Sequence, residues 1–156
     1  MEQSTAQAEV IVNLPRAEVW QRLRDLTIPH KYVPGLRDCR MTTEQKEGIG
    51  ASRRVYTTSG MEMDETVVEW NEGKGFVIKL HDGAKPPPPI FSAARFHYIL
   101  EDAPGGKTKF LPTMTYTLKF GVLGSLLDKL LINMIVRSNM KKVGVGLKQF
   151  YETGKP

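Results

Sequence analysis

The chain has 156 residues, of which 40% are hydrophobic and 25% are charged, and its formal net charge is +5. These values are ordinary for one soluble globular domain that is long enough to bury a core. An excess of Lys and Arg indicates binding to nucleic acid or to an anionic membrane surface when the charges form a block in the sequence. No such block is present, so we expect no nucleic-acid partner.

The cysteine content and the first residues bear on the compartment and on the kind of site. Cys39 is the single cysteine, which excludes a disulfide framework and a zinc site made of cysteines. The N-terminal MEQSTAQ lacks the basic-then-apolar pattern of a secretion signal. The most apolar segment, residues 121–136, contains Asp128 and Lys129 and is shorter than the ~20 apolar residues of a membrane-spanning helix. We therefore expect a cytoplasmic protein without a transmembrane segment.

The first elements predicted along the chain are one strand and two short helices. Residues 8–13, AEVIVN, are typical of a strand, and residues 14–26 follow with apolar side chains at helical spacing. Pro15 suits the first turn of that helix. Residues 27–36, TIPHKYVPGL, contain two prolines and allow only a short second helix.

Six further strands and one long helix complete the predicted order. The strands are separated by short turns rich in glycine, which favours an antiparallel meander. They are expected at residues 37–45, 51–59, 62–70, 75–81, 94–101 and 107–120. From residue 122 to 152 the apolar period becomes helical. One stripe of that helix consists of Ile132, Val136, Met140, Val143, Leu147 and Phe150.

This order predicts an α+β fold. We expect a seven-stranded curved antiparallel sheet wrapped around the long C-terminal helix, with the two short helices between strands 1 and 2. The helix must cover one face of the sheet, because no other element is available to bury its apolar stripe. No linker or internal repeat is visible, so residues 1–156 are expected to form a single domain.

The two-residue period of each strand indicates which side chains face the helix. The predicted inner face is apolar and rich in Met, Phe and Tyr. Its apolar side chains include Val55, Met63, Val67, Phe76, Ile78, Phe96 and Met114. Its few polar groups are Arg53, Thr57, Glu65, Tyr98 and Tyr116.

Glu65 is the most informative residue of this face. A carboxylate among apolar side chains is costly to bury unless it is paired, hydrogen-bonded or hydrated. Two interpretations stay open. Either Glu65 reaches solvent or is satisfied by Arg53, or it faces a cavity and is a functional group. Tyr98 and Tyr116 likewise either pack in the core or line the same cavity.

Several motifs that would indicate other chemistries are absent. The sequence contains no phosphate-binding loop, dinucleotide fingerprint or nucleophile elbow. His30, His81 and His97 are far apart in the chain, and no carboxylate lies beside them at metal-ligand spacing. We expect neither a metal site nor a cofactor.

A run of four prolines, Pro86, Pro87, Pro88 and Pro89, separates two predicted strands. Proline lacks a backbone donor, so the run cannot lie inside a sheet. It favours a polyproline II rod of about 3.1 Å per residue. We expect a stiff loop at the rim of a cavity; the alternative is a docking motif for a proline-binding domain.

Three segments carry a family resemblance: residues 8–39, residues 48–70, and residues 118–152 with LKFGVLGSLLDKLLINMIV and LKQFYE. Over roughly its full length the chain resembles the START/Bet-v-1-like helix-grip superfamily (SRPBCC), and most of all its polyketide cyclase/dehydrase-and-lipid-transport-like branch. The resemblance implies a long cavity between a seven-stranded sheet and the C-terminal helix. It indicates fold more than chemistry, because this fold hosts many unrelated activities.

The resemblance also implies positions for cavity groups. Glu65 falls where the abscisic acid receptors of this superfamily keep a cavity carboxylate, and Asn139 matches a polar cavity position on the helix. The gate signature and the cavity lysine of those receptors have no counterpart here, so hormone reception is not implied. The expected ligand-binding residues are Val55, Thr57, Met63, Glu65, Val67, Phe76, Ile78, Phe96, Tyr98, Met114, Tyr116, Leu131, Ile135 and Asn139.

Three functions are compatible with this pattern. The first is carriage or sequestration of a small hydrophobic ligand such as a lipid, quinone, polyketide or steroid-like molecule. The second is a cofactor-independent cyclase, aromatase or dehydratase that uses Glu65 with Tyr98 or Tyr116 as general acid and base. The third is a homodimer through the first half of the C-terminal helix, where apolar residues cover more than one face. The cations Arg137, Lys141, Lys142 and Lys148 are expected on a solvated face of that helix.

Overall fold

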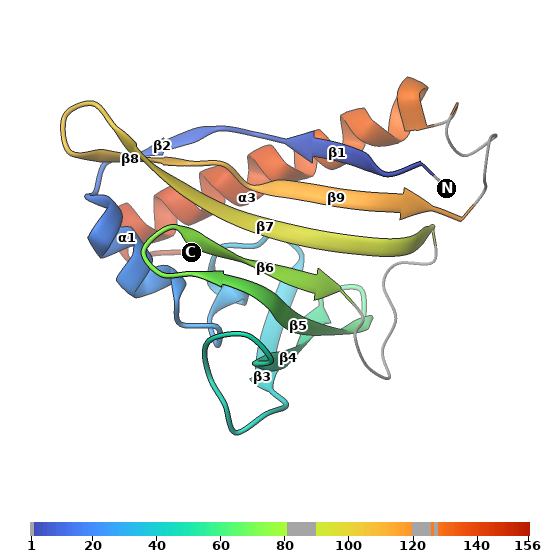
Figure 1. The fold of residues 1–156 in the computed structure, drawn as a ribbon, viewed down its shortest axis with the longest axis horizontal. Helices are drawn as coiled ribbons and strands as arrows, with labels where there is room; N and C mark the ends of the chain where they lie inside the picture. The colour runs from blue at the N-terminus through green and yellow to red at the C-terminus, as the bar shows by residue number, and fades with distance from the viewer. Residues whose placement is uncertain (1, 81–89, 120–125, 127) are drawn as a thin grey trace.

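The computed structural model describes residues 2–80, 90–119, 126 and 128–156. It has the predicted α+β architecture, a curved antiparallel sheet with one long helix across a single face (Figure 1). The elements are β1 (Ser4–Gln7), β2 (Val10–Val12), α1 (Arg16–Leu23), η1 (Pro29–Lys31), β3 (Leu36–Met41), β4 (Ser52–Thr57), β5 (Glu62–Asn71), β6 (Gly75–Leu80), β7 (Phe91–Ala103), β8 (Lys107–Phe110), β9 (Thr113–Leu118), η2 (Asp128–Ile132) and α3 (Asn133–Thr153).

The sheet has nine strands where the sequence predicted seven. Strand β1 precedes the expected first strand, residues 8–13, which contains only β2, and the expected last strand, residues 107–120, is divided into β8 and β9. The interval between β1 and β2 lies beside the division between β8 and β9, because β1 pairs with β9 and β2 pairs with β8. Pro112 sits at the break and cannot donate to a ladder, although its carbonyl accepts a 3.1 Å hydrogen bond from the Ala8 amide. Pro112 therefore explains one of the two additional strands, and the unpredicted β1 is the other.

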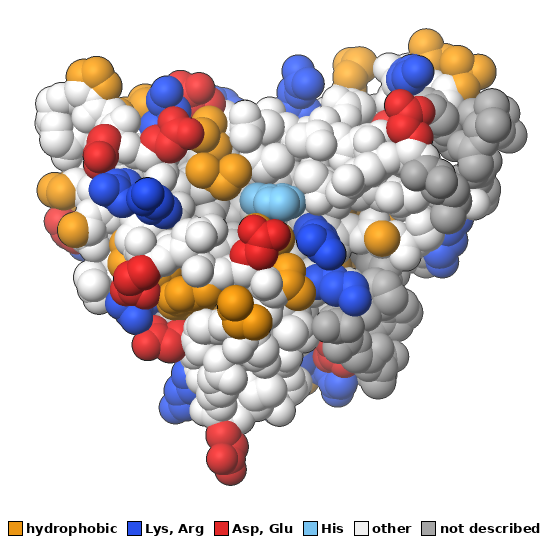
Figure 2. Space-filling model, in the orientation of Figure 1, with side chains coloured by type: hydrophobic (Ala, Val, Ile, Leu, Met, Phe, Trp, Pro, Cys, Tyr) orange, Lys and Arg blue, Asp and Glu red, His pale blue; other side chains and the backbone are white. Residues whose placement is uncertain are grey.

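The strand order is β1-β9-β7-β6-β5-β4-β3, and every pair is antiparallel. The long strand β7 pairs with β6 on one side and with β9 and β8 in turn on the other. In Figure 2 the face of the sheet turned away from α3 carries charged side chains of both signs around one histidine. The opposite face is therefore the one that forms the core with α3.

The long helix begins later as a regular α-helix than the sequence predicted. A π-helical turn, η2, precedes α3, and residues 120–125 and 127 lie outside the described part. The predicted apolar stripe is buried, except that Phe150 is only partly buried and Tyr151 occupies the buried position. The buried side chains are Ile132, Val136, Met140, Val143, Leu147 and Tyr151.

A close approach between α3 and η1 depends on glycine. A Cβ atom at Gly146 would lie 2.3 Å from the carbonyl oxygen of Tyr32, and one at Gly144 would lie 2.4 Å from Val10 Cγ2. Any larger side chain would push the helix away from both elements. This contact brings Tyr32, which is 4% exposed, into the space between helix and sheet.

The two predicted short helices are present as α1 and η1. Val19, Trp20 and Leu23 form the buried face of α1. Trp20 packs edge-on against Trp70 at 5.0 Å between ring centroids. Within the described ranges, no helix combines the length and the apolar character that crossing a membrane requires.

Candidate functional site

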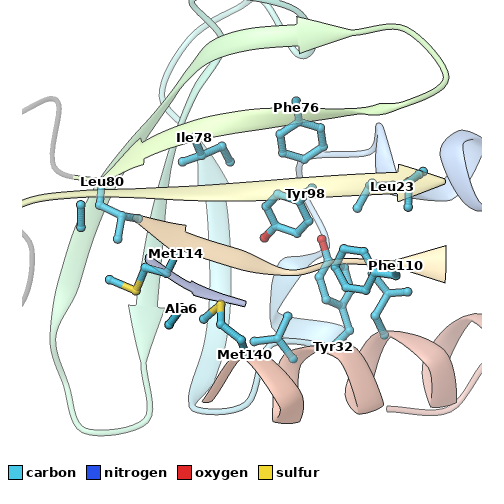
Figure 3. Close-up of a cluster of buried hydrophobic side chains, with 14 of the residues drawn as sticks. Ala6, Leu23, Tyr32, Phe76, Ile78, Leu80, Tyr98, Phe110, Met114 and Met140 are labelled. Atoms are coloured by element: carbon cyan, nitrogen blue, oxygen red, sulfur yellow. The ribbon is translucent and has the colours of Figure 1, made fainter. Parts of the chain in front are cut away.

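The inner face of the sheet is formed by the side chains that strand alternation predicted. Figure 3 shows Phe76, Ile78, Tyr98 and Met114 projecting from the strands toward α3, where Met140 meets them. Phe76 and Tyr98 lie 4.6 Å apart between ring centroids, and Phe96 lies 4.4 Å from Tyr98. These rings form one aromatic layer under the helix, into which a small polar cluster is set.

The centre of that polar cluster is an ion pair between neighbouring strands. Arg53 on β4 lies opposite Glu65 on β5, and Arg53 Nε donates to Glu65 Oε2 at 2.7 Å. Arg53 Nη1 also donates to the carbonyl oxygen of Leu26 at 2.9 Å. Arg53 is 3% exposed and Glu65 is 8% exposed. Glu65 is thus paired with Arg53, as one of the two interpretations proposed.

Two tyrosines complete the cluster. The hydroxyls of Tyr32 and Tyr98 are directed into the same space between the sheet and α3 (Figure 3). Burial raises the pKa of Tyr98, and the Glu65 carboxylate raises it further, although hydrogen bonding to Arg53 and Tyr32 partly opposes this. Burial also holds the pKa of Tyr32 well above its usual value. Both hydroxyls therefore keep their protons and serve as hydrogen-bond donors near neutral pH.

The charge on Arg53 survives its enclosure because of these neighbours. Burial on its own lowers the pKa of the guanidinium, since a charged group loses hydration. The attraction of Glu65, followed by Tyr98 and Tyr32, outweighs that effect, and the pKa of Arg53 is raised above its ordinary value. The cluster therefore holds a fixed positive charge next to the Glu65 carboxylate.

Glu65 also lines a cavity of about 250 Å³ between the sheet and α3. The volume is slightly below the ~300–1,000 Å³ of ordinary small-molecule sites. The lining is mainly apolar, and its polar side chains besides Glu65 are Asn139 and Lys142 on α3. The full set is Val33, Pro34, Leu36, Met63, Glu65, Leu80, Phe96, Asn139, Met140, Lys142 and Val143. Glu65 is thus paired through Oε2 and also borders the cavity, while a functional role for it stays a prediction.

The predicted ligand-binding residues divide into four groups, the last of which consists of two exposed helix residues described below. Met63, Glu65, Phe96 and Asn139 line this cavity. Seven others are buried in the core and do not border it: Val55, Val67, Phe76, Ile78, Tyr98, Met114 and Tyr116. Thr57 lies at the β4–β5 turn, where its Oγ1 accepts a 2.9 Å hydrogen bond from the Met61 amide. The prolines Pro86, Pro87, Pro88 and Pro89 fall outside the described residues.

Two helix residues require a correction. Leu131 and Ile135 were expected to line the cavity, but they are 51% and 50% exposed. The adjacent residues Ile132 and Val136 occupy the buried stripe instead. One residue corresponds to about 100° around a helix, so a neighbour of the stripe is turned out of the core.

Tyr116 belongs to a different cluster from Glu65. Its hydroxyl donates to Asp128 of η2, and Ser4 donates to the same carboxylate. Asn133 Nδ2 donates to the Tyr116 hydroxyl at 3.2 Å and to the Thr5 carbonyl at 3.0 Å. Burial and the hydrogen bond to Asp128 raise the pKa of Tyr116 to about 12. Of the two tyrosines considered for acid–base chemistry with Glu65, the structure therefore brings only Tyr98 to it.

Sequence reasoning missed Tyr32 and Asp128. Tyr32 follows a short helix, where no period reveals which way a side chain points. Asp128 was taken for an interruption of an apolar segment, although a single carboxylate in LLDKLL was itself a signal of a buried partner. Among the described residues no three His, Cys, Asp or Glu side chains are grouped to hold a metal ion.

Comparison with known proteins identifies the family. The family model described as polyketide cyclase / dehydrase and lipid transport matches residues 3–152. No curated protein matches the chain.

Solved structures match over nearly the whole chain. TTHA0849 from Thermus thermophilus has a TM-score of 0.71 and 19% identity, covering 98% of this chain and 100% of its own. The Zhui aromatase/cyclase from a Streptomyces species, R1128, has a TM-score of 0.69 and 10% identity, covering 98% of each chain. The di-domain ARO/CYC StfQ of the steffimycin biosynthetic pathway has a TM-score of 0.74 and 16% identity, covering 96% of this chain and 51% of its own.

At these identities the structural matches establish the fold alone, which is the predicted helix-grip fold. The family model covers all but a few residues at either end. The chain therefore belongs to the polyketide cyclase/dehydrase and lipid transport family of the SRPBCC superfamily.

Proposed function

We propose that this protein binds a small apolar molecule carrying a hydroxyl group in the cavity between the sheet and α3. The observation that supports this most is the position of Glu65, a carboxylate on the wall of an otherwise mainly apolar cavity of about 250 Å³. An apolar lining with few polar groups suits a site in which burial drives affinity and polar groups fix orientation.

The chemistry of the polar groups narrows the ligand class. A carboxylate accepts hydrogen bonds and cannot donate them. Glu65 Oε2 already accepts from Arg53, which leaves the other oxygen as the acceptor for a ligand. The ligand therefore presents a donor, and a hydroxyl is the donor that suits an apolar molecule. Asn139 and Lys142 stand at the α3 side of the cavity and offer further donors.

The size of the cavity limits the ligand as well. A volume of 250 Å³ corresponds to the bulk volume of about eight water molecules. A one- or two-ring aromatic alcohol fits this space, whereas a complete phospholipid does not. Within the lipids, quinones, polyketides and steroid-like molecules considered at first, small aromatic polyketide-like alcohols suit the cavity best.

A pair of probes tests the proposal. We expect 1-naphthol to bind about tenfold more tightly than 1-methoxynaphthalene, because only the former donates a hydrogen bond to a charged acceptor. Glu65→Gln should remove most of that preference. The matched control is Glu69→Gln, since Glu69 is an exposed residue of the same strand. Equal affinity for both probes in the unaltered protein would refute a role for Glu65 in ligand recognition.

An enzyme is the second candidate, and one observation favours it. Tyr98 and Glu65 belong to the same buried cluster, so a proton donor lies behind the carboxylate of the cavity wall, although Tyr98 itself does not border the cavity. The raised pKa of Tyr98 keeps this hydroxyl protonated near neutral pH, so in a reaction it would begin as a proton donor and not as a base. Tyr98→Phe should then abolish turnover of a polyketide-like substrate while leaving 1-naphthol affinity within about twofold. A binding protein would show no turnover to lose.

A further inference from the structure

The N-terminal part of the long helix exposes a contiguous set of large apolar side chains, which we call the apolar patch. It consists of Leu126, Leu130, Leu131, Met134 and Ile135, with exposures of 57%, 68%, 51%, 68% and 50%. Hydrophobic side chains gather over the upper right of Figure 2, where Figure 1 places the beginning of α3. A concentration of this kind on one helix indicates a contact surface rather than scattered exposure.

The exposed charges that the helix itself carries around the apolar patch have one sign. Between residues 126 and 142 the cations are Lys129, Arg137, Lys141 and Lys142, and all four are exposed. The single acidic residue, Asp128, is buried and accepts from Tyr116 and Ser4. No carboxylate within the described ranges forms an ion pair with any of these four cations. The margin that the helix supplies is thus positive, while Glu2 of the N-terminal segment lines a pocket with Lys129 and adds one exposed carboxylate at that end.

The apolar patch precedes the cavity-lining residues along the helix, although none of its own residues lines the cavity. Asn139 and Lys142 line the cavity from α3. Ile135 precedes Asn139 by four residues, which places both on one edge of the helix, and Leu131 precedes Ile135 by the same step. The later half of α3 is held against the sheet by Val143 and Leu147, which are at most 4% exposed. The apolar patch is therefore presented by a fixed helix next to the cavity.

We propose that the apolar patch docks on the surface of an anionic lipid bilayer. Its leucine, methionine and isoleucine side chains enter the boundary between headgroups and acyl chains, and the four cations contact the headgroups. Docking brings the cavity to the bilayer surface, where apolar alcohols concentrate. The sequence predicted only that these cations lie on a solvated face of the helix, and membrane docking goes beyond that prediction. Docking does not depend on the ligand binding proposed above.

The cations beside the apolar patch favour a bilayer over a second copy of the chain as the partner of this surface. A two-fold dimer through the apolar patch would bring the same cations of both copies together. Like charges in such a contact oppose association. An anionic bilayer neutralises all four cations at once, so it matches both the apolar and the charged part of the surface.

Vesicle flotation tests the docking directly. The protein is mixed with vesicles of phosphatidylcholine alone or of phosphatidylcholine with phosphatidylglycerol, at low and at high salt. We expect binding to the anionic vesicles, weakened by salt. Leu131→Ser with Ile135→Ser should weaken it by about tenfold or more, because two anchoring side chains are lost. The control is Ile49→Ser, an equally exposed apolar residue, 64%, in the β3–β4 loop.

A matched pair of charge variants separates a local effect from net charge. We expect a triple variant to lower the partition constant between water and anionic vesicles about a hundredfold, or about fivefold for each charge removed. It combines Arg137→Gln, Lys141→Gln and Lys142→Gln. Lys46→Gln, Lys107→Gln and Lys155→Gln change the net charge equally at exposed positions elsewhere and should have a much smaller effect. All of these side chains are exposed, so the fold is expected to survive.

Three results would overturn the proposal. These are no binding to anionic vesicles at low salt, equal loss in both sets of charge variants, or a stable dimer by light scattering that Leu131→Ser with Ile135→Ser dissociates. The last result would assign the apolar patch to self-association. Binding of 1-naphthol is measured without vesicles, so failure of the docking and failure of the ligand site are distinguishable.

Discussion

Arg53 and Glu65 face each other across β4 and β5, with Nε 2.7 Å from Oε2 and both side chains less than a tenth exposed. A buried pair of this kind contributes little compared with well-packed apolar residues, but breaking it leaves an uncompensated charge. The pair therefore maintains a carboxylate on the cavity wall at a tolerable energetic cost.

The first prediction follows from that asymmetry. Arg53→Met should lower the free energy of unfolding by about 3–5 kcal/mol, because Glu65 then lacks its partner. Combining Arg53→Met with Glu65→Leu should recover most of the loss. Urea denaturation of both variants measures the difference. A double variant that stays about as unstable as Arg53→Met, far below the unaltered protein, would show that the pair is net stabilising.

The second prediction concerns alkaline pH. Folding raises the pKa of Tyr116 from 10.0 to about 12, so the folded state retains a proton that the unfolded chain releases. The resulting stability is fully present below pH 10 and is lost as the pH rises toward 12. The limiting slope for one such group is about 1.4 kcal/mol per pH unit. Tyr116→Phe should flatten the fall in stability between these values, measured against the unaltered protein.

A third prediction concerns Asp128, which connects β1 and β9 to the turn before α3. Ser4 and Tyr116 both donate to Asp128, which joins β1 and β9 to η2. Asp128→Leu should leave both hydroxyls without their acceptor and cost about 1–3 kcal/mol. Hydrogen exchange should then increase in β1 and at the start of α3. Thr153→Ala, which removes a hydrogen bond at the exposed end of the same helix, serves as the control and should leave that exchange unchanged.

The fourth prediction sets packing against helix propensity. Propensity alone favours Gly146→Ala by about 1 kcal/mol. The Cβ atom would lie 2.3 Å from the Tyr32 carbonyl oxygen, so we expect a net loss of about 1–3 kcal/mol instead. Thermal melting gives the sign. An increase in stability would mean that η1 moves away from α3 without cost.

Much of the fold was predictable because alternation and helical period are direct signs of burial. Val67, Phe76 and Tyr98 were assigned to the inner face by strand alternation alone, and each is at most 3% exposed. The pairing of Glu65 with Arg53 was foreseen as one alternative, because both lie at inward positions of consecutive strands. Strand β1 and the division of the expected last strand at Pro112 were missed, since the short polar segment of β1 has no apolar alternation and a single proline in a long segment does not by itself show a break.

The candidate site was less predictable than the fold. Leu131 and Ile135 were assigned to the cavity because the helix is apolar on more than one face, and sequence alone does not tell which face packs. Tyr32 reaches the cluster only through the close approach of η1 to α3. That contact joins residues far apart in the chain, so no local sequence pattern predicts it.

We propose that small apolar alcohols bind beside Glu65, and carbon-13 NMR of the methionine methyl groups during titration with 1-naphthol reports on that position. Met63 and Met140 line the cavity, whereas Met61 and Met134 are exposed. Ring-current shifts confined to Met63 and Met140, and diminished in Glu65→Gln, are the predicted result. Shifts at Met134 with none at Met63 would contradict the account and place binding on the helix surface instead.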